Sequence, residues 1–166
     1  MATYPTKKTV CASAPDLFIH IFLKDGIIIS SELHANPNQG FAYQISTNKP
    51  SDTENLVHRW MKDYSQGQNT LVNLPLDWQI LPPYTAIVLK ALQAIPFGSV
   101  FSYRDIAIQT ANPKASRAVG NACARNPFPL FIPCHRVIAS DGSLGGYSGG
   151  LPIKISLLDF ETAKFT

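Results

Sequence analysis

The sequence is poor in cysteine and in charge, and it has no long uninterrupted apolar run. Its three cysteines, Cys11, Cys123 and Cys134, do not form the framework of a small disulfide-rich secreted domain and favour free thiols in a reducing compartment. The apolar stretch at residues 17–29 is broken by Lys24-Asp25-Gly26 and is too short to cross a bilayer. We therefore expect a cytoplasmic protein that does not contact membranes.

Charged residues make up 15% of the 166-residue chain and hydrophobic residues 45%, which excludes a disordered protein and fits a globular one with a sizeable core. The formal net charge is +3 and the pI about 8.8. A charge this small permits contact with nucleic acid but does not require it. The length suggests one domain, or two small lobes that share a core.

The first half predicts a small α/β lobe. Lys24-Asp25-Gly26 separates apolar runs at residues 17–23 and 27–33, which is typical of a β-hairpin, and residues 41–46 predict a third strand. Apolar residues then recur at helical spacing: Leu56, Val57, Trp60, Met61 and Tyr64. We expect residues 1–80 to form this lobe, an antiparallel sheet with one helix, and the proline-rich residues 71–83 to connect it to the second half.

The second half, residues 81–166, predicts a mainly helical domain. One helix carries an apolar face and ends at Pro96-Phe97-Gly98; the face comprises Tyr84, Ile87, Val88, Ala91, Leu92 and Ile95. Ser102 with Asp105 three residues later resembles a capping box, so a second helix should run to about Gln109. Asn112 before Pro113 predicts the start of a third helix that ends near Arg125.

Two short helices joined by a turn are typical of a helix-turn-helix. The second of them has an inward stripe of small residues, namely Ala115, Ala118, Val119, Ala122 and Cys123. Its other side carries Lys114, Arg117, Asn121 and Arg125, and Gly120 lets a ligand approach the backbone closely. This face fits contact with DNA, and equally an ordinary solvated helix surface.

A reactive site is predicted at Cys134 and His135. A thiolate is the best nucleophile among the side chains, and a nearby histidine lowers the pKa of a thiol. Adjacent residues point in different directions, so if His135 is the base it works through a bound water. Among the candidate partners for His135, which are Asp141, Asp159 and Glu161, we favour Glu161, because it shares a helix face with Leu157 and Leu158. The alternative is a frayed helix end with Glu161 in solvent.

A glycine-rich segment, residues 140–150, lies between the cysteine and the last helix. Tyr147 and Ser148 are its substantial polar side chains, and its backbone suits the wall of a pocket for a flat ligand. A phosphate-binding loop is excluded, because no lysine followed by serine or threonine ends the segment.

These residues resemble one family. Several motifs look like those of the O6-alkylguanine-DNA alkyltransferases, also called methylated-DNA–protein-cysteine methyltransferases: Ile95-Pro96-Phe97-Gly98, Ser102-Tyr103, Ser116-Arg117-Ala118-Val119-Gly120, Asn126-Pro127, Pro129, Ile132-Pro133-Cys134-His135-Arg136-Val137 and Gly146-Tyr147-Ser148-Gly149-Gly150. The resemblance is close at residues 84–161 and faint over the first 80. It implies a ribonuclease-H-like first lobe, and a second domain with a winged-helix-like helix-turn-helix.

The resemblance also implies the chemistry. An alkyl group passes irreversibly from O6 of guanine, and from O4 of thymine, to Cys134, without turnover and without a cofactor or metal. His135, through water, and Glu161 deprotonate the thiol, while Asn126 holds the turn before the cysteine. Tyr103 donates to N3 of guanine, Ser148 contacts O6, and the Cys134 and Val137 carbonyls read the exocyclic amine. Tyr147 and Pro129 line the alkyl pocket, whose breadth depends on the loop around Gly145.

The partner implied is double-stranded DNA, bound by a monomer through the minor groove with the target nucleotide flipped out. Arg117 then fills the vacated place in the base stack, and the other contacts come from Lys114, Ala118, Gly120, Asn121 and Arg125. Some relatives bind zinc near the N-terminus, but here only Cys11 is available early, so we expect no zinc site. Two other functions fit the same residues: a helix-turn-helix regulator indifferent to Cys134, and a Cys-His hydrolase with multiple turnover.

Overall fold

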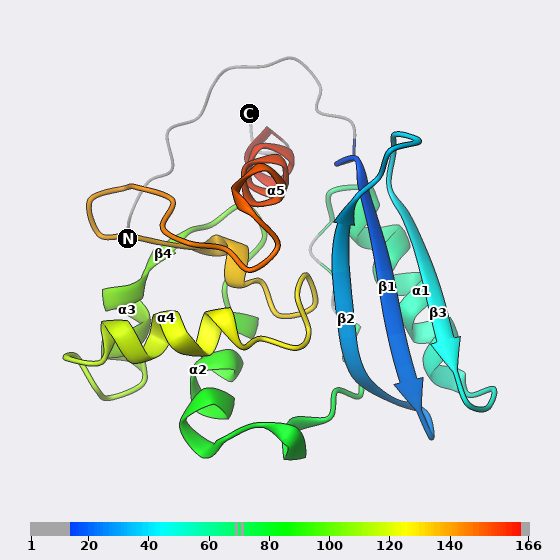
Figure 1. Ribbon diagram of the computed structural model, residues 1–166, viewed down its shortest axis with the longest axis horizontal. Helices are drawn as coiled ribbons and strands as arrows, with labels where there is room; N and C mark the ends of the chain where they lie inside the picture. The colour runs from blue at the N-terminus through cyan, green and yellow to red at the C-terminus, as the bar shows by residue number, and fades with distance from the viewer. Residues whose placement is uncertain (1–13, 69, 71, 164–166) are drawn as a thin grey trace.

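A mixed three-stranded sheet occupies one side of the molecule in the computed structural model, which describes residues 14–68, 70 and 72–163 (Figure 1). The strands β1 (Leu17–Lys24) and β2 (Ile27–Ala35) form the predicted hairpin. Asp25 and Gly26 both have positive φ, 53° and 80°, which is the backbone of a two-residue hairpin turn that matches the strand twist. The sequence prediction of this hairpin is confirmed.

The third strand corrects one prediction, because the sheet is not wholly antiparallel. The strand β3 (Ala42–Thr47) pairs with β1 in parallel, and the strand order is β2-β1-β3. After β2 the chain crosses the end of the sheet and returns beside β1, so it runs opposite to β2 and therefore parallel to β1. The apolar pattern fixes which residues face inward, but it does not fix the neighbour of a strand, and this is why the prediction was wrong.

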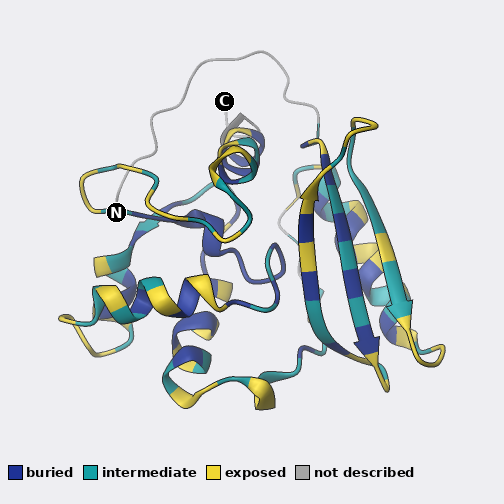
Figure 2. Ribbon diagram, in the orientation of Figure 1, coloured by how far each residue is buried: buried dark blue, intermediate teal, exposed yellow. Residues whose placement is uncertain are grey.

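The helix α1 (Asp52–Ser65) covers the face of the sheet that lies behind the strands in Figure 1. A capping box at Ser51 and Glu54 begins it, and its buried side includes the predicted Val57, Trp60, Met61 and Tyr64. Inward residues of the central strand β1 alternate with half-buried ones, as Figure 2 shows. Together these side chains form the part of the core that lies between sheet and helix.

A connecting segment then runs along the sheet edge to the helical half. Its Leu76 forms a bridge with Ile28 of β2, and the short helix η1 (Trp78–Ile80) leads into α2 (Pro83–Gln93). The predicted helix 84–95 is thus present with Pro83 in its first turn, but Ile87 is 51% exposed while Leu89 is fully buried. The α2 helix turns a slightly different side inward than the sequence pattern indicated.

The two predicted short helices are α3 (Tyr103–Gln109) and α4 (Ser116–Ala124), and they pack against each other and against α2. The capping box of Ser102 and Asp105 begins α3 as expected. The α4 helix begins three residues later than predicted, because Ala111, just after α3, has φ 56° and Asn112–Ala115 form a turn of their own. Pro113 therefore belongs to this turn and not to the first position of α4.

The remaining elements assemble around the chain that follows α4. The strands β4 (Phe101–Ser102) and β5 (Val137–Ile138) pair in parallel, and the short helix η2 (Cys134–Arg136) directly precedes β5. The last helix, α5 (Leu151–Ala163), packs against η2. The segment before η2 is tied to the sheet, since Ser31 donates from its backbone N to the carbonyl of Pro127 and from its hydroxyl to that of Pro129.

The hairpin offers a matched test of the core. Replacing the fully buried Ile21 by alanine should cost about 2–5 kcal/mol of unfolding free energy through lost burial and a residual cavity. The same change at Ile27, which is 43% exposed in the same hairpin, should cost less than about 1 kcal/mol. Urea denaturation of both variants checks this, and equal losses would contradict the burial assigned to β1.

Candidate active site

Cys134 begins η2 at the end of a buried turn, and only 3% of its surface is exposed. Asn126, which follows α4, organises that turn: its amide nitrogen donates to the carbonyl of Ile132 at 2.9 Å and to Sγ of Cys134 at 3.2 Å. Its amide oxygen accepts from the backbone N of Phe128 at 3.0 Å. The end of α4 and the reactive sulfur are thereby held in one hydrogen-bonded unit.

His135 is fully buried and points away from the thiol, toward α5. Its Nε2 lies 2.7 Å from Oε1 of Glu161, which is itself 1% exposed. Because the Glu161 pKa is lowered to about 2, the carboxylate is ionised and must accept this hydrogen bond, so Nε2 carries the proton. The other ring nitrogen, Nδ1, is buried and makes no hydrogen bond to any described residue. An unprotonated Nδ1 is the nitrogen free to act as a base.

Glu161 is held from several directions. Arg136 forks onto it, with Nε donating to Oε2 at 2.7 Å and Nη2 to Oε1 at 3.0 Å, and Nη1 donates to the carbonyl of Ile95. Tyr64 of α1 donates from its hydroxyl to Oε1 at 2.9 Å. Burial alone raises the pKa of this carboxyl, but His135 and Arg136 outweigh it and lower the pKa. The prediction of a Glu161–His135 pair is confirmed by this geometry, and the solvent-exposed alternative is wrong.

A buried cation also faces the site. The amine of Lys154, a fully buried residue, donates to the carbonyl of Val137 at 2.6 Å and to that of Leu144. Burial lowers the Lys154 pKa to about 8, while interaction with Cys134 and Cys123 raises it. At neutral pH the buried charges are then Lys154, Arg136 and Glu161, with a neutral His135, whose pKa is lowered mainly by burial. A thiolate at Cys134 would balance the one excess positive charge.

At rest the thiol is protonated. Burial raises the Cys134 pKa, while the hydrogen bond from Asn126 and the charge of Lys154 lower it and only partly compensate. The Tyr147 hydroxyl is buried beside the sulfur without a hydrogen bond of good geometry to a described residue. The resting thiol is therefore a weak nucleophile, and a base must remove its proton to activate it.

A cavity of about 380 Å³ opens onto Cys134. Its lining residues are Tyr103, Gly120, Cys123, Ala124, Cys134, Gly146, Tyr147 and Ser148. Burial raises the Tyr103 pKa to about 12, so its hydroxyl stays a proton donor in this cavity. Gly145 has φ 65° and packs on that hydroxyl, which a Cβ there would meet at 3.0 Å. Glycine at position 145 is thus required both for the backbone and for the placement of Tyr103.

Of the residues predicted for substrate binding, Pro129, Val137 and Gly145 are not among those that line this cavity. Pro129 is not among the lining residues of the cavity, and its carbonyl accepts the hydrogen bond from Ser31 of the sheet. Val137 is fully buried and its carbonyl already accepts from Lys154. Tyr103, Tyr147 and Ser148 line the cavity, and Pro129 and Val137 each contribute a carbonyl to a hydrogen bond of the surrounding scaffold. The roles of all five in substrate binding stay predictions.

The predicted DNA-contacting side chains are exposed: Lys114, Arg117, Asn121 and Arg125. Arg117 and Asn121 lie on α4, Arg125 caps its end, and Lys114 lies in the preceding turn. Ala118 and Gly120 are half-buried on the same helix. A second, shallower cavity of about 450 Å³ adjoins the first and is lined by Tyr103, Ser116, Arg117, Gly120, Asn121 and Gly146. The exposed helix face is therefore continuous with the approach to Cys134.

Three residues of the site escaped the sequence reading. Lys154 is seven positions before Glu161 on α5, a spacing that places both on one helix face and signals a shared buried environment. Arg136 was noted only as part of a motif. Tyr64 gave no such signal, because its position in the apolar stripe of α1 predicts packing and not a hydrogen bond 97 residues away.

No cluster of metal-binding side chains and no helix able to span a membrane occurs in the part of the chain that the structure describes. Cys11, the early cysteine on which the expectation of no zinc site rests, lies outside the described residues. Cys123 and Cys134 are both free thiols.

This geometry is typical of one class of protein, in which a buried cysteine lies beside a histidine that a carboxylate orients, here at a cavity next to an arginine-bearing helix. Comparison with known proteins gives the family. The sequence profile of the DNA-binding domain of 6-O-methylguanine DNA methyltransferase matches residues 83–163. The constitutive methylated-DNA–protein-cysteine methyltransferase of Bacillus subtilis is 39% identical over 124 residues, which cover 73% of this chain and 74% of that protein.

Other relatives agree. The human methylated-DNA–protein-cysteine methyltransferase is 51% identical over 75 residues, which cover 45% of this chain and 36% of the human protein. The OGT of Mycobacterium tuberculosis, solved in complex with DNA, superposes with a TM-score of 0.66 at 26% identity, covering 89% of this chain and 94% of that one. The chain belongs to the methylated-DNA–protein-cysteine methyltransferase family.

The Glu161 carboxylate makes a testable contribution to stability. Glu161→Gln leaves the Arg136 guanidinium buried without its counter-charge and should cost about 3–5 kcal/mol of unfolding free energy at neutral pH. The folded-state pKa of Glu161 is depressed, so its contribution is present above the ordinary value of 4.5 and is lost as the pH falls toward about 2. The stability gap between wild type and variant should therefore narrow over that range.

Denaturant titrations at several pH values measure this gap. Glu32→Gln, at a side chain that is 57% exposed in an ion pair with His34, is the control and should lose less than about 1 kcal/mol. A gap for Glu161→Gln that stays constant down to pH 2 would show that the pKa of Glu161 is not lowered in the folded protein.

Proposed function

We propose that this protein repairs DNA by direct damage reversal, taking an alkyl group, chiefly methyl, from O6 of guanine onto Sγ of its own Cys134. O4-alkylthymine is the proposed second substrate. The observation that carries the proposal is the buried Cys134 at the floor of a cavity, with a base-competent His135 fixed by Glu161, in a chain of this family. A regulator that only binds DNA has no use for this arrangement.

Activation begins at His135. Its Nδ1 accepts the Cys134 proton through one bridging water, because neighbouring residues of η2 do not face each other directly. Glu161 then stabilises the imidazolium that forms. Asn126 and Lys154 stabilise the thiolate, through a hydrogen bond to sulfur and through the otherwise uncompensated positive charge.

Transfer is a displacement at the alkyl carbon. The thiolate forms a carbon–sulfur bond as the bond from that carbon to O6 breaks, and the electron pair of the broken bond remains on the guanine. Tyr103, whose hydroxyl keeps its proton up to a pKa of about 12, donates to N3 and stabilises the leaving group, and Ser148 contacts O6. Tyr147 forms the wall for the alkyl group. The thioether product is chemically stable, so each molecule acts once.

Guanine O6 lies inside a base pair, so the target nucleotide must leave the helix, at a cost of a few kcal/mol. The α4 helix suits delivery through the minor groove, because Ala118 and Gly120 allow close approach and the exposed Arg117 can replace the extruded base in the stack. The neighbouring Lys114, Asn121 and Arg125 are the proposed backbone and groove contacts. In this proposal α3 and α4 form the helix-turn-helix.

We place the boundary between the N-terminal lobe and the DNA-binding domain near residues 80 and 81, where the connecting segment enters α2. The free thiols Cys123 and Cys134 fit a reducing, cytoplasmic environment, and the protein acts as a monomer in this proposal.

Mass spectrometry tests the transfer directly. Mixing with duplex DNA that contains O6-methylguanine should add one methyl group permanently to Cys134 and to no other residue. Cys134→Ser should gain no mass, whereas Cys123→Ser, at the other thiol of the same cavity, should still be methylated. An unchanged mass of the reduced, folded wild-type protein would refute the proposed function, and repeated product release would indicate a hydrolase.

Arg117→Ala separates delivery from chemistry. We expect a rate about 10- to 100-fold lower on duplex DNA, because the vacated stack is left unfilled, and a much smaller loss on free O6-benzylguanine, which needs no extrusion. Single-turnover kinetics on both substrates measure the ratio. Arg59→Ala, at an exposed arginine of α1, is the control for lost positive charge. Equal losses on both substrates would argue against base flipping by Arg117.

A further inference from the structure

The Oε1 atom of Glu161 accepts three hydrogen bonds, and one of them comes from the opposite lobe. His135 Nε2 donates at 2.7 Å, Arg136 Nη2 at 3.0 Å and the Tyr64 hydroxyl at 2.9 Å. Two of these donors belong to η2, next to the reactive cysteine, whereas Tyr64 belongs to the last turn of α1. The lobe that carries no reactive residue thus touches the atom that orients the proposed base.

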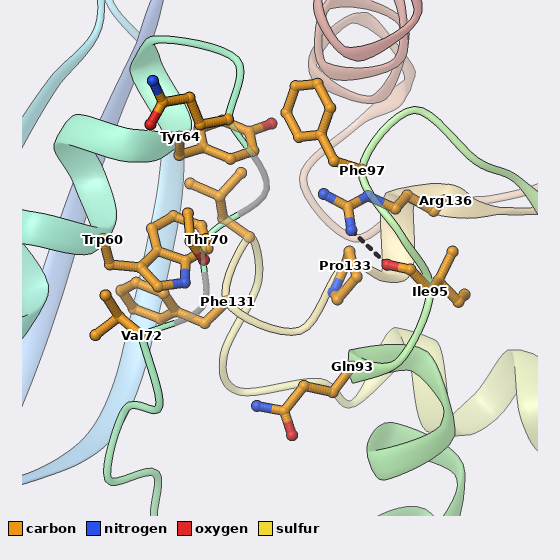
Figure 3. A pocket seen from close by; sticks show the side chains of 12 residues that line it. Trp60, Tyr64, Thr70, Val72, Gln93, Ile95, Phe97, Phe131, Pro133 and Arg136 are labelled. Carbon is orange, nitrogen blue, oxygen red and sulfur yellow. Dashed lines mark hydrogen bonds between the residues drawn. The ribbon is translucent and has the colours of Figure 1, made fainter.

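The Tyr64 side chain is buried among aromatic rings, and its hydroxyl donates to Glu161. It is 1% exposed, its ring stacks on Trp60 at 5.2 Å, and it packs in a T-shaped pair with Phe97 and a tilted pair with Phe160. Figure 3 shows Tyr64 and Trp60 on one side of the small pocket between the lobes, and Phe97 and Arg136 on the other. A phenol buried this deeply costs free energy unless it is hydrogen-bonded, and Glu161 is the acceptor.

His135, Arg136 and Tyr64 all donate to Oε1 of Glu161, so a change in one of these hydrogen bonds alters the strength of the others. Each hydrogen bond that Oε1 accepts withdraws electron density, so the Tyr64 hydroxyl weakens the hold of Oε1 on the Nε2 proton of His135. It also fixes the rotation of the carboxylate, since Oε2 is already engaged by Arg136 at 2.7 Å. The orientation and basicity of the imidazole therefore depend on a residue of α1.

We propose that Tyr64 is a positioning residue for the Cys134 reaction, through which the N-terminal lobe sets the base strength of His135. This inference rests on the proposed alkyl transfer, because the base strength of His135 matters only if Cys134 is activated. The ionisable groups that face this network are Arg136 and Cys134 of η2, Lys154 and Glu161 of α5, Tyr147 of the loop before α5, and Tyr64 of α1. Tyr64 is the one among them that the other lobe supplies.

The decisive variant is Tyr64→Phe, which removes the hydroxyl and keeps the aromatic contacts. With one donor fewer on Oε1, His135 becomes more basic and stays protonated to higher pH. The acid limb of the pH–rate profile of Cys134 should then move up by about half a pH unit, a roughly threefold lower rate along that limb. Installing 3-fluorotyrosine at position 64, a stronger hydrogen-bond donor, should move the limb the opposite way.

Two probes of Cys134 are compared over pH: iodoacetamide, with modified peptides identified by mass, and duplex DNA containing O6-methylguanine. Tyr43→Phe is the matched control, because it also removes one tyrosine hydroxyl that is hydrogen-bonded. That hydroxyl, on β3, lies 2.6 Å from Nδ1 of His58 on α1, at the surface. Thermal melting verifies that each variant is folded. A role in packing alone would lower the melting temperature without moving the limb.

The outcomes separate two failures. Limbs displaced in opposite directions by Tyr64→Phe and by fluorotyrosine, with Tyr43→Phe unchanged, support the inference. Profiles that superimpose on wild type for both probes overturn it and leave the proposed function intact. A displaced iodoacetamide limb in a protein that takes no methyl group from DNA supports the link from Tyr64 to Cys134 and refutes the repair function.

Discussion

The buried carboxylate of Glu161 must be fully hydrogen-bonded, and the rest of the structure is arranged around that requirement. A carboxylate at 1% exposure would cost several kcal/mol if it were left unpaired. Its donors come from η2, from α1 and from the backbone N of Gly98, while its own helix, α5, also carries Lys154, whose charge acts on the thiol. One charge thus ties the C-terminal helix, the reactive turn and the N-terminal lobe into a single arrangement.

The hydrogen-bonded network around Glu161 lies between the cavity at Cys134 and the interface between the two lobes. On the side of the cavity, α4 and the glycine-rich loop leave Cys134 reachable by a ligand. On the other side, aromatic side chains of both lobes lie around Arg136, and among them Trp60 and Phe131 form a T-shaped pair at 4.9 Å. The sheet is attached through Ser31 to the turn that precedes the cysteine. The N-terminal lobe therefore supports the reactive turn from behind and does not compete with the substrate.

Local sequence signals predicted local structure well. The Asp25-Gly26 hairpin, the apolar face of α1 and the Ser102 capping box follow from short-range sterics and hydrogen bonding, and all are present. Contacts between segments far apart in the sequence could not be predicted from local patterns. The parallel partner of β3, the late start of α4 and the Tyr64–Glu161 bond depend on how distant segments meet. Within the site, the Cys134 motif located the sulfur, but the Lys154 contact with Val137 and the Ser31 contact with Pro129 emerged only from packing.

The order of the site residues along the chain has a consequence for biosynthesis. Glu161 follows His135 by 26 residues, so a ribosome that adds about 5–20 residues per second exposes the cysteine a few seconds before the carboxylate that orients its base. Until α5 docks, the imidazole has neither a fixed tautomer nor a buried counter-ion, and the Lys154 charge is absent. A nascent chain therefore carries an ordinary thiol. The protein becomes able to carry out its single reaction only once it is folded.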